Sequence, residues 1–303
     1  MEKRELTMLS YGGGQDSTAI LYKIINDSWF RAKYVKGDLI VVMADTKNEH
    51  IHTDDYLIRI EEICEENDIP FFHLDPSYWA SNSWRGGLIE FYQKKNTVGS
   101  KAFPKTCTDN LKIRPIYKFL DEHIHAEYNC GTRNRSGKLM KSAIKDFAAS
   151  NGKINVLIGI AKGEEKRASE NGSSGMKWFD TSINKQYPLI EEGMDRQACQ
   201  DYITSVGEKV PYPSNCILCP FMSLQELLYL YRYDRPSYDL WVKLEANKMK
   251  ANEHMEEKNL GVWGKRDPLP EVLKQAEVKF GHMTEQELVD YKMSHGHCVM
   301  SKY

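Results

Sequence analysis

The sequence predicts an α/β fold in which a parallel sheet is flanked by helices, followed by a helical C-terminal extension. Three observations lead to this fold class. Short apolar runs alternate with amphipathic stretches in the first half of the chain, as in parallel sheets. A run of three glycines, residues 12–14, lies between the first apolar run and the first amphipathic stretch. From residue 234 onward, no segment has the pattern of a strand.

Each predicted element follows from its own pattern. Strands are predicted where apolar residues run between turn-forming residues, at 6–9, 38–44, 70–74 and 155–160. Helices are predicted at 17–26, 53–67, 87–92, 111–124, 195–206 and 224–233. Pro115 is compatible with a helix if it lies in the first turn. Thr284 and Glu287 form a capping box that opens a last helix. These elements predict an α/β domain over residues 1–222 and a helical region over 223–303.

Composition excludes several classes of protein. The 303 residues include 41 Lys+Arg and 43 Asp+Glu, so the net charge of −2 argues against a protein that coats DNA nonspecifically. No apolar run approaches the ~18 residues of a membrane helix. The first residues, MEKRELTML, lack the apolar core of a signal peptide, so we expect a cytoplasmic protein whose seven cysteines are reduced thiols.

The glycine run predicts a phosphate-binding loop. Gly12, Gly13 and Gly14 let backbone N–H groups crowd around phosphate oxygens, and the start of the next helix adds a positive dipole. The next polar residues can add contacts: Ser17 and Thr18 as hydrogen-bond donors, and Asp16 as a magnesium ligand or helix cap. The segment matches neither a Walker loop nor GxGxxG. The alternative is a tight turn that merely tolerates glycine.

Two further groups follow predicted strands, where parallel sheets bind ligands. Asp45 and Thr46 follow the second strand and could contact adenine or ribose, or simply cap a loop. Lys162, Lys166 and Arg167 follow the strand at 155–160 and could clamp a phosphate or a substrate anion. The alternative for this second group is a solvated loop.

Three of the seven cysteines have positions that suggest shared chemistry. Cys216 and Cys219 form a CxxC before a helix, which could be redox-active, half of a zinc site or part of an iron–sulfur site. Cys107 also precedes a helix, so three thiolates could hold a [4Fe-4S] cluster with one iron open. A structural zinc (Zn), with Cys130 or a His as fourth ligand, and inert thiols remain alternatives. Cys298 is predicted to lie in an unstructured terminus.

Two segments are candidates for nucleic-acid contact. Residues 126–153 carry six basic and two acidic side chains, a net +4, and form a basic insertion that we expect near one edge of the site. Aromatic residues are also interleaved with positive charge in the segment that contains Trp79, Trp84, Tyr92, Lys94, Lys95 and Lys101. This pattern is typical of a single-strand-binding surface, although most charge runs are solvated faces. The aromatic-rich stretch 229–241 is predicted to be helical core.

An ordered set of motifs spans residues 10 to about 221. The segments are SYGGGQDST at 10–18, DTKNE at 45–49, CTDNLKIRP at 107–115, GIAKGEEKR at 159–167, YPLI at 187–190 and CILCPF at 216–221. Together they resemble the PAPS reductase-like branch of the PP-loop ATP pyrophosphatases, a superfamily with an adenine nucleotide alpha hydrolase-like, Rossmann-like fold. Within that branch, the chain looks most like the ATP pyrophosphatases of DNA phosphorothioation or the related tRNA-thiolation enzymes.

The resemblance implies a function. It implies that the loop holds the phosphates of ATP with Mg²⁺ while an acceptor oxygen attacks the α-phosphate, so that pyrophosphate leaves and sulfur then replaces the adenylated oxygen. Asp16, Ser17 and Arg167 would be catalytic, and Gly12, Gly13, Gly14, Ser17, Thr18, Asp45, Thr46 and Lys162 would bind the nucleotide. A nucleic acid, DNA or tRNA, would be the acceptor. A cysteine desulfurase would donate the sulfur.

Departures from the family pattern keep two alternatives open. Thr108 stands where assimilatory reductases have a second adjacent Cys, and the tail around Cys298 lacks their Glu-Cys-Gly-x-His order. These differences weigh against a sulfonucleotide (PAPS/APS) reductase acting with thioredoxin. Gly12 replaces the usual Ser and Gln15 is unusual, which leaves a non-catalytic nucleotide-binding regulator as the other alternative. The oligomeric state has no signal in the sequence.

Overall fold

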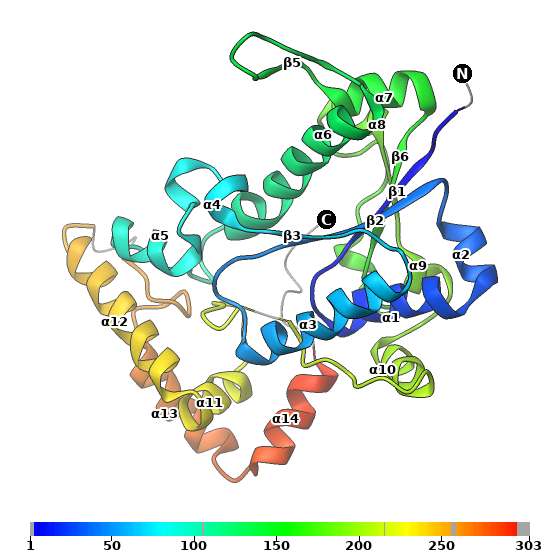
Figure 1. Cartoon of the computed structure of the whole chain (residues 1–303). Helices are drawn as coiled ribbons and strands as arrows, with labels where there is room; N and C mark the ends of the chain where they lie inside the picture. The colour runs from blue at the N-terminus through cyan, green and yellow to red at the C-terminus, as the bar shows by residue number, and fades with distance from the viewer. Residues whose placement is uncertain (1–2, 105, 215, 256–258, 296–303) are drawn as a thin grey trace.

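The computed structural model describes residues 3–104, 106–214, 216–255 and 259–295. Its centre is a five-stranded sheet in the order β3-β2-β1-β6-β7, in which every neighbouring pair is parallel. The strands are β1 (Leu6–Ser10), β2 (Asp38–Ala44), β3 (Phe71–Leu74), β6 (Ile154–Ile158) and β7 (Ile183–Gln186). Helices lie on both faces of the sheet (Figure 1). The predicted parallel sheet flanked by helices is therefore confirmed.

Alternate side chains of the central strand enter two separate cores, as expected for a strand buried on both faces. Leu9 packs on one face with Leu157, and Met8 packs on the other face with Val156. The first face is covered by α1 (Gln15–Asn26), α2 (Ser28–Tyr34), α3 (Ile51–Glu66), α9 (Pro188–Glu191) and α10 (Arg196–Ser205). The second face is covered by α6 (Arg114–Tyr128), α7 (Ala143–Asn151) and α8 (Lys177–Ser182).

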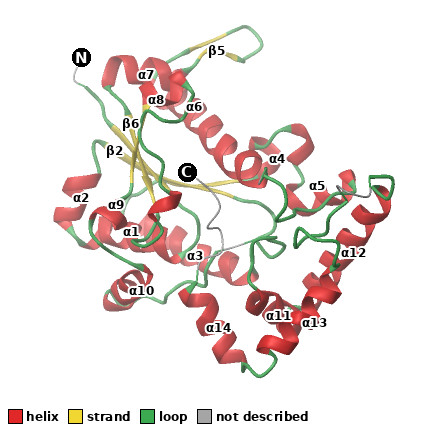
Figure 2. Cartoon of the chain, turned by 180° about the vertical axis from the view of Figure 1, so that it is seen from behind, coloured by secondary structure: helices red, strands yellow, loops and turns green. Residues whose placement is uncertain are grey.

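The C-terminal region is helical, as predicted. It contains α11 (Leu224–Tyr233), α12 (Arg235–Ala251), α13 (Leu269–Phe280) and α14 (Glu285–Ser294), and no strand occurs among its described residues (Figure 2). The predicted capping box of Thr284 and Glu287 is present at the start of α14. Trp241 and Tyr238 of the 229–241 stretch are buried in the core of this region, as predicted, whereas Tyr233 is 42% exposed.

The helical core also takes in a segment that precedes α6 in sequence. This segment contains α4 (Pro76–Trp79), η1 (Asn82–Trp84) and α5 (Gly87–Lys95). Trp84 and Tyr92 are 6% and 5% exposed and belong to the core shared with α11 to α13. Lys101 lies over the ring of Trp263, with its Nζ 3.6 Å from the centroid. The expected base-stacking surface is therefore wrong for these two aromatic residues, because almost none of either side chain is exposed on the outer surface.

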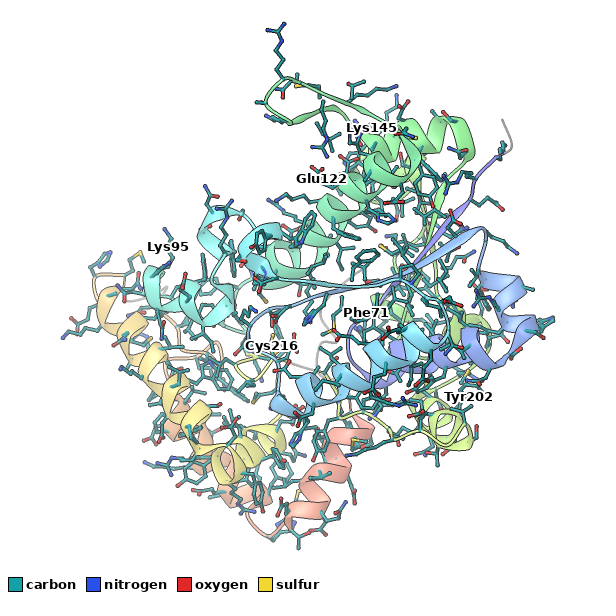
Figure 3. The ribbon with its side chains drawn as sticks, viewed as in Figure 1. Phe71, Lys95, Glu122, Lys145, Tyr202 and Cys216 are labelled. Carbon is teal, nitrogen blue, oxygen red and sulfur yellow. The ribbon has the colours of Figure 1, made fainter. Side chains whose placement is uncertain are left out.

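The basic insertion lies at the edge of the sheet opposite the one predicted. It forms a two-stranded antiparallel hairpin, β4 (Thr132–Arg133) and β5 (Leu139–Lys141), followed by α7. Just before the hairpin, Tyr128 donates a hydrogen bond to Asp38, which opens β2, at 2.7 Å. The hairpin projects beyond the amino ends of the strands, and Figure 3 places Lys145 and Glu122 well away from Cys216. The expectation that the insertion borders the active site is wrong, because α6 carries the chain away from that edge.

Two elements had no clear signal in the sequence. β7 alternates buried Ile183 and Lys185 with half-buried Asn184 and Gln186, so it lacks a continuous apolar run. Residues 109–113 form a π-helical turn, η2, ahead of α6, and Pro115 sits in the first turn of α6. Among the described residues, no helix has both the length and the apolar content needed to cross a membrane.

Candidate functional site

A cavity of about 480 Å³ opens at the carboxyl ends of the strands. Three kinds of wall enclose it. The glycine-loop wall contains Gly12, Gly14, Asp16, Ser17, Arg167 and Arg196. The thiol wall contains Thr46, Tyr92, Cys107, Lys112, Cys216 and Cys219. The third wall is largely apolar and contains Met8, Ile116, Tyr117, Val156, Phe179 and Lys185. The site therefore joins a phosphate-type loop, a group of sulfurs and an apolar chamber.

The glycine loop is held in shape by hydrogen bonds. Ser17 accepts the N–H of Gly12 at 3.1 Å and donates to the carbonyl of Gly14 at the same distance. Gly13 has φ +71°, and a Cβ there would lie 2.9 Å from the Thr53 methyl group, so this position favours glycine. Gly14 caps α1 without a side chain, which leaves the first N–H groups of the helix directed at the cavity.

Two residues that were predicted to contact a phosphate are not at the cavity. Thr18 is fully buried, and its hydroxyl hydrogen-bonds with Tyr11 at 2.9 Å. Gly13 does not line the cavity. The predicted phosphate contacts are therefore retained for Gly12, Gly14, Asp16 and Ser17, while Thr18 stabilises the start of the helix from within the core.

Asp16 is the acidic group of the loop. Its Oδ2 lies 3.8 Å from Nη2 of Arg196, and its Oδ1 is buried without a hydrogen-bond partner in the described chain. Burial raises the pKa of Asp16, and the positive charge of Arg196 lowers it in part. A buried carboxylate oxygen without a partner fits a ligand of Mg²⁺, which binds proteins through one or two carboxylates and substrate phosphates.

Arg167 and Arg196 are joined through one carboxylate. Glu164 accepts hydrogen bonds from Arg167 and, at 2.9 Å, from Arg196. Both arginines line the cavity, where the predicted role of Arg167 would place it, and that role stays a prediction. Lys162 and Lys166 do not line it. Lys162 is exposed, so its predicted nucleotide contact is not supported by this geometry.

The segment after β2 separates two hollows. Thr46 faces the main cavity, where its hydroxyl lies 3.0 Å from Glu49 and 3.8 Å from the sulfur of Cys216. Glu49 also pairs with Lys112 at 3.2 Å. Asp45 instead lines a separate shallow hollow and forms an ion pair with Lys47 at 3.0 Å. The predicted adenine or ribose contact is therefore compatible with Thr46 but not with Asp45.

The structure brings the three predicted thiols to one wall. Cys107, Cys216 and Cys219 all line the cavity, and Figure 3 shows Cys216 in the interior of the molecule. Loss of solvent, and then the charge of Glu49, raises the pKa of the Cys216 thiol, and the neighbouring Cys107 and Cys219 add to this effect. The backbone of the CxxC loop is fixed by a hydrogen bond from Ile217 N to the carbonyl of Asn48, 2.9 Å long.

The sulfurs do not form a metal-ligand set in this arrangement. Within the described residues, no group of three or more His, Cys, Asp or Glu side chains is placed to hold a metal ion. Cys130, the alternative fourth zinc ligand, is wrong for this site: it lies at the far end of α6, near Tyr128. Cys298 lies outside the described residues.

Several cavity residues had no signal in the sequence. Arg196, Lys185 and Ser214 come from segments distant from the glycine loop, and folding alone brings them there. Ser214 donates a hydrogen bond to the carbonyl of Gly12. Lys185 stands beside Val156 in the sheet and donates to the hydroxyl of Ser169. Lys112 is different, because it lies within the CTDNLKIRP motif at 107–115, and this motif could have identified it as a site residue.

Nine chains of solved structures match this structure, among them a reductase and a thiolase. No family model and no curated protein matches the chain. A phosphoadenylyl-sulfate (PAPS) reductase from Candida auris, solved as a phosphate complex, matches with a TM-score of 0.38 and 15% identity, over 70% of this chain and 76% of that chain. The U34-tRNA thiolase NcsA from Methanococcus maripaludis, solved with its [4Fe-4S] cluster, matches with a TM-score of 0.40 and 14% identity, over 93% of this chain and 75% of that chain.

Proposed function

We propose that the protein is an ATP pyrophosphatase that adenylates an acceptor oxygen so that sulfur can replace it. The observation that supports this most directly is the shared cavity. One space of about 480 Å³ is bordered by the glycine loop, two arginines and three thiols. A triphosphate suits the loop and the arginines, and the apolar chamber suits a nucleoside or an acceptor group.

The proposed reaction has two stages, adenylation of the acceptor and replacement of AMP by sulfur. The acceptor oxygen attacks the α-phosphorus of ATP, the bond to the bridging oxygen of the β-phosphate breaks, and pyrophosphate leaves. The terminal sulfur of a donor persulfide then displaces AMP from the adenylated acceptor. A second thiol cleaves the S–S bond to the donor by forming a disulfide, and external thiol such as the added cysteine reduces that disulfide. N–H groups at the start of α1, with Arg167 and Arg196, would stabilise charge on the phosphates. Mg²⁺, held by Asp16 and the phosphates, would neutralise the leaving group when bound.

The acceptor proposed here is a nucleic acid, DNA or tRNA, with a cysteine desulfurase as sulfur donor. The support is the basic hairpin, in which Arg135 and Lys138 are exposed. Its other cations, Arg133 and Lys141, are paired with Glu122 and Asp146. The 15 residues of α6 separate hairpin and cavity by about 22 Å. The hairpin would therefore hold the backbone of an extended acceptor far from the reacting group.

The test is pyrophosphate release from Mg-ATP with tRNA, duplex DNA or no acceptor, in the presence of cysteine and a desulfurase. We expect release to be stimulated by one acceptor and to be abolished in Asp16→Ala. Asp201→Asn, an exposed change on α10, serves as the control. Unchanged turnover in Asp16→Ala would contradict the assignment of the loop. Sulfite release from PAPS or APS would replace this proposal with the reductase, and nucleotide binding without turnover would replace it with the regulator.

The hairpin has its own test. Replacing Arg135 and Lys138 with Ala should weaken nucleic-acid binding and lower its salt dependence. The reason is that a protein with fewer phosphate contacts releases fewer counterions from the nucleic acid when it binds. Release of pyrophosphate without acceptor should stay unchanged. Equal binding and equal salt dependence in the double variant would remove the hairpin from the proposal.

A further inference from the structure

The side chain of Gln15 connects the glycine loop to the end of the chain. Gln15 is the first residue of α1 and is 2% exposed. Its Nε2 donates to the carbonyl of Pro211 at 3.2 Å and lies 3.4 Å from the sulfur of Met293 in α14. Its Oε1 accepts from Gln200 of α10 at 3.0 Å, and the same Gln200 amide donates to the carbonyl of Met293. Three distant segments therefore meet on one side chain.

Helix α14 is anchored at this place by a second contact. Lys292, 3% exposed, has its Nζ 3.0 Å from Nε2 of His50, which caps α3. The same Nζ lies 5.5 Å from the ring centroid of Tyr212 and 5.6 Å from that of Tyr229. The last turn of α14 is therefore fixed against the sheet domain by Lys292 as well as by Met293.

Gln15 lies in the first turn of α1, next to the backbone N–H groups that would bind a phosphate. The first N–H groups of α1 have no intrahelical acceptor, and Gly14 offers no side-chain cap to fix their direction. Ser214 packs closely against the same turn, since a Cβ on Gly14 would lie 2.9 Å from the Ser214 hydroxyl. The direction of the first turn therefore depends on the groups packed around it. Asp16 also contacts α10 through Arg196, but the Gln15 side chain links the turn to both α10 and α14.

We propose that Gln15 is a positioning residue through which α14 holds the glycine loop in its phosphate-binding geometry. This inference rests on one part of the proposed function, namely that the glycine loop binds the phosphates of ATP. It gives the helical C-terminal region a role in nucleotide binding, although α14 contributes no residue to the cavity wall. It also assigns a purpose to the loop position that departs from the family pattern.

The test compares Met293→Ala and Gln15→Ala with Gln286→Ala. Met293→Ala removes only the α14 side of the contact, so it stays informative if Gln15→Ala fails to fold. Gln286 lies on the exposed face of the same helix, where it bonds to Asp290, and is the matched control. Met293→Leu keeps the volume and removes the sulfur. The measurements are Mg-ATP affinity by calorimetry, pyrophosphate release, and amide hydrogen exchange of residues 15–18.

We expect Met293→Ala and Gln15→Ala each to weaken Mg-ATP binding about five- to tenfold and to speed exchange of the α1 amides without nucleotide. The double variant should be little worse than either single one, because both remove the same contact. KM should rise more than kcat falls, since Arg167 and the thiol wall stay in place while the phosphate-binding turn loosens. Gln286→Ala should match the wild type, and Met293→Leu should recover part of the loss.

Three results separate this inference from the proposed function. Lowered thermal stability with unchanged ATP affinity and unchanged exchange of residues 15–18 would overturn the positioning role. A wild-type protein that binds ATP but releases no pyrophosphate would overturn the proposed function, while the affinity arm still decides the positioning role. If the wild type binds no ATP, unchanged exchange in Met293→Ala overturns the inference, and faster exchange confined to the α1 start supports it.

Discussion

Arg196 lies against Asp16, with its Nη2 3.8 Å from Oδ2 of the carboxylate and 2.9 Å from Oε1 of Glu164. The arginine is the first residue of α10, whereas the aspartate is the second residue of α1. Both lie at the carboxyl edge of the sheet, where burial raises the pKa of Asp16 and Arg196 counters part of that rise. The arginine therefore extends the pH range over which Asp16 is ionised.

Replacing Arg196 should shift the pH dependence of the reaction. In Arg196→Ala, the pKa of Asp16 should rise further, because burial would act without its main opposing charge. If the ionised carboxylate is the active form, the acidic limb of the pyrophosphate-release profile should move to higher pH. Activity near neutrality should fall about tenfold or more. Arg196→Lys should move the limb less, and an unmoved limb in Arg196→Ala would contradict the pairing.

Two glycine substitutions should have opposite outcomes. A Cβ on Gly159 would lie 2.7 Å from the backbone N of Ser17, so Gly159→Ala should displace the start of α1 and abolish ATP binding. A Cβ on Gly12 would meet only Ser17 Oγ, at 3.9 Å, so Gly12→Ser should be tolerated. Calorimetric titration with Mg-ATP measures both effects. Full affinity in Gly159→Ala, with the fold intact by circular dichroism, would contradict the close approach.

Lys292 should make stability rise with pH. Burial lowers its pKa from 10.5 to about 8, against the opposing charges of Glu226 and Asp234. Between those two values the unfolded chain binds more protons, so the free energy of unfolding should increase by up to about 3 kcal/mol as pH rises from 8 to 10.5. Lys292→Met lacks this contribution. Urea unfolding at pH 8 and at pH 10.5 should show that the wild type gains free energy of unfolding relative to Lys292→Met. An equal change in the two proteins would contradict the burial of the Lys292 amine.

The metal group remains a prediction that elemental analysis can decide. If the thiol wall binds a [4Fe-4S] cluster, anaerobically purified protein should contain iron and acid-labile sulfide. Cys107→Ser and Cys219→Ser should lose both, because both thiols lie on the same cavity wall. Cys130→Ser is the matched control, since that thiol lies at the other end of α6. Protein with zinc and no iron would refute the cluster, and protein without either metal would leave three reduced thiols.

Local patterns predicted the elements whose signals are local. β2 was predicted with its observed bounds because its apolar run is continuous, and α14 was predicted from the Thr284–Glu287 capping box. β7 was not predicted, since a strand with Asn184 and Lys185 has no apolar run. The hairpin was recognised as basic, but its position was wrong, because charge has no bearing on which edge of a sheet a segment reaches.

The candidate site divides in the same way. The sequence alone determined the glycine loop, the strand-end position of Arg167 and the three thiols, because glycine, arginine and cysteine have distinctive chemistry wherever the chain places them. Tertiary structure decided that Thr18 turns into the core, that Asp45 faces another hollow, and that Arg196 and Gln15 complete the loop. These contacts join residues far apart in the chain, and packing between α1, α10 and α14 creates them.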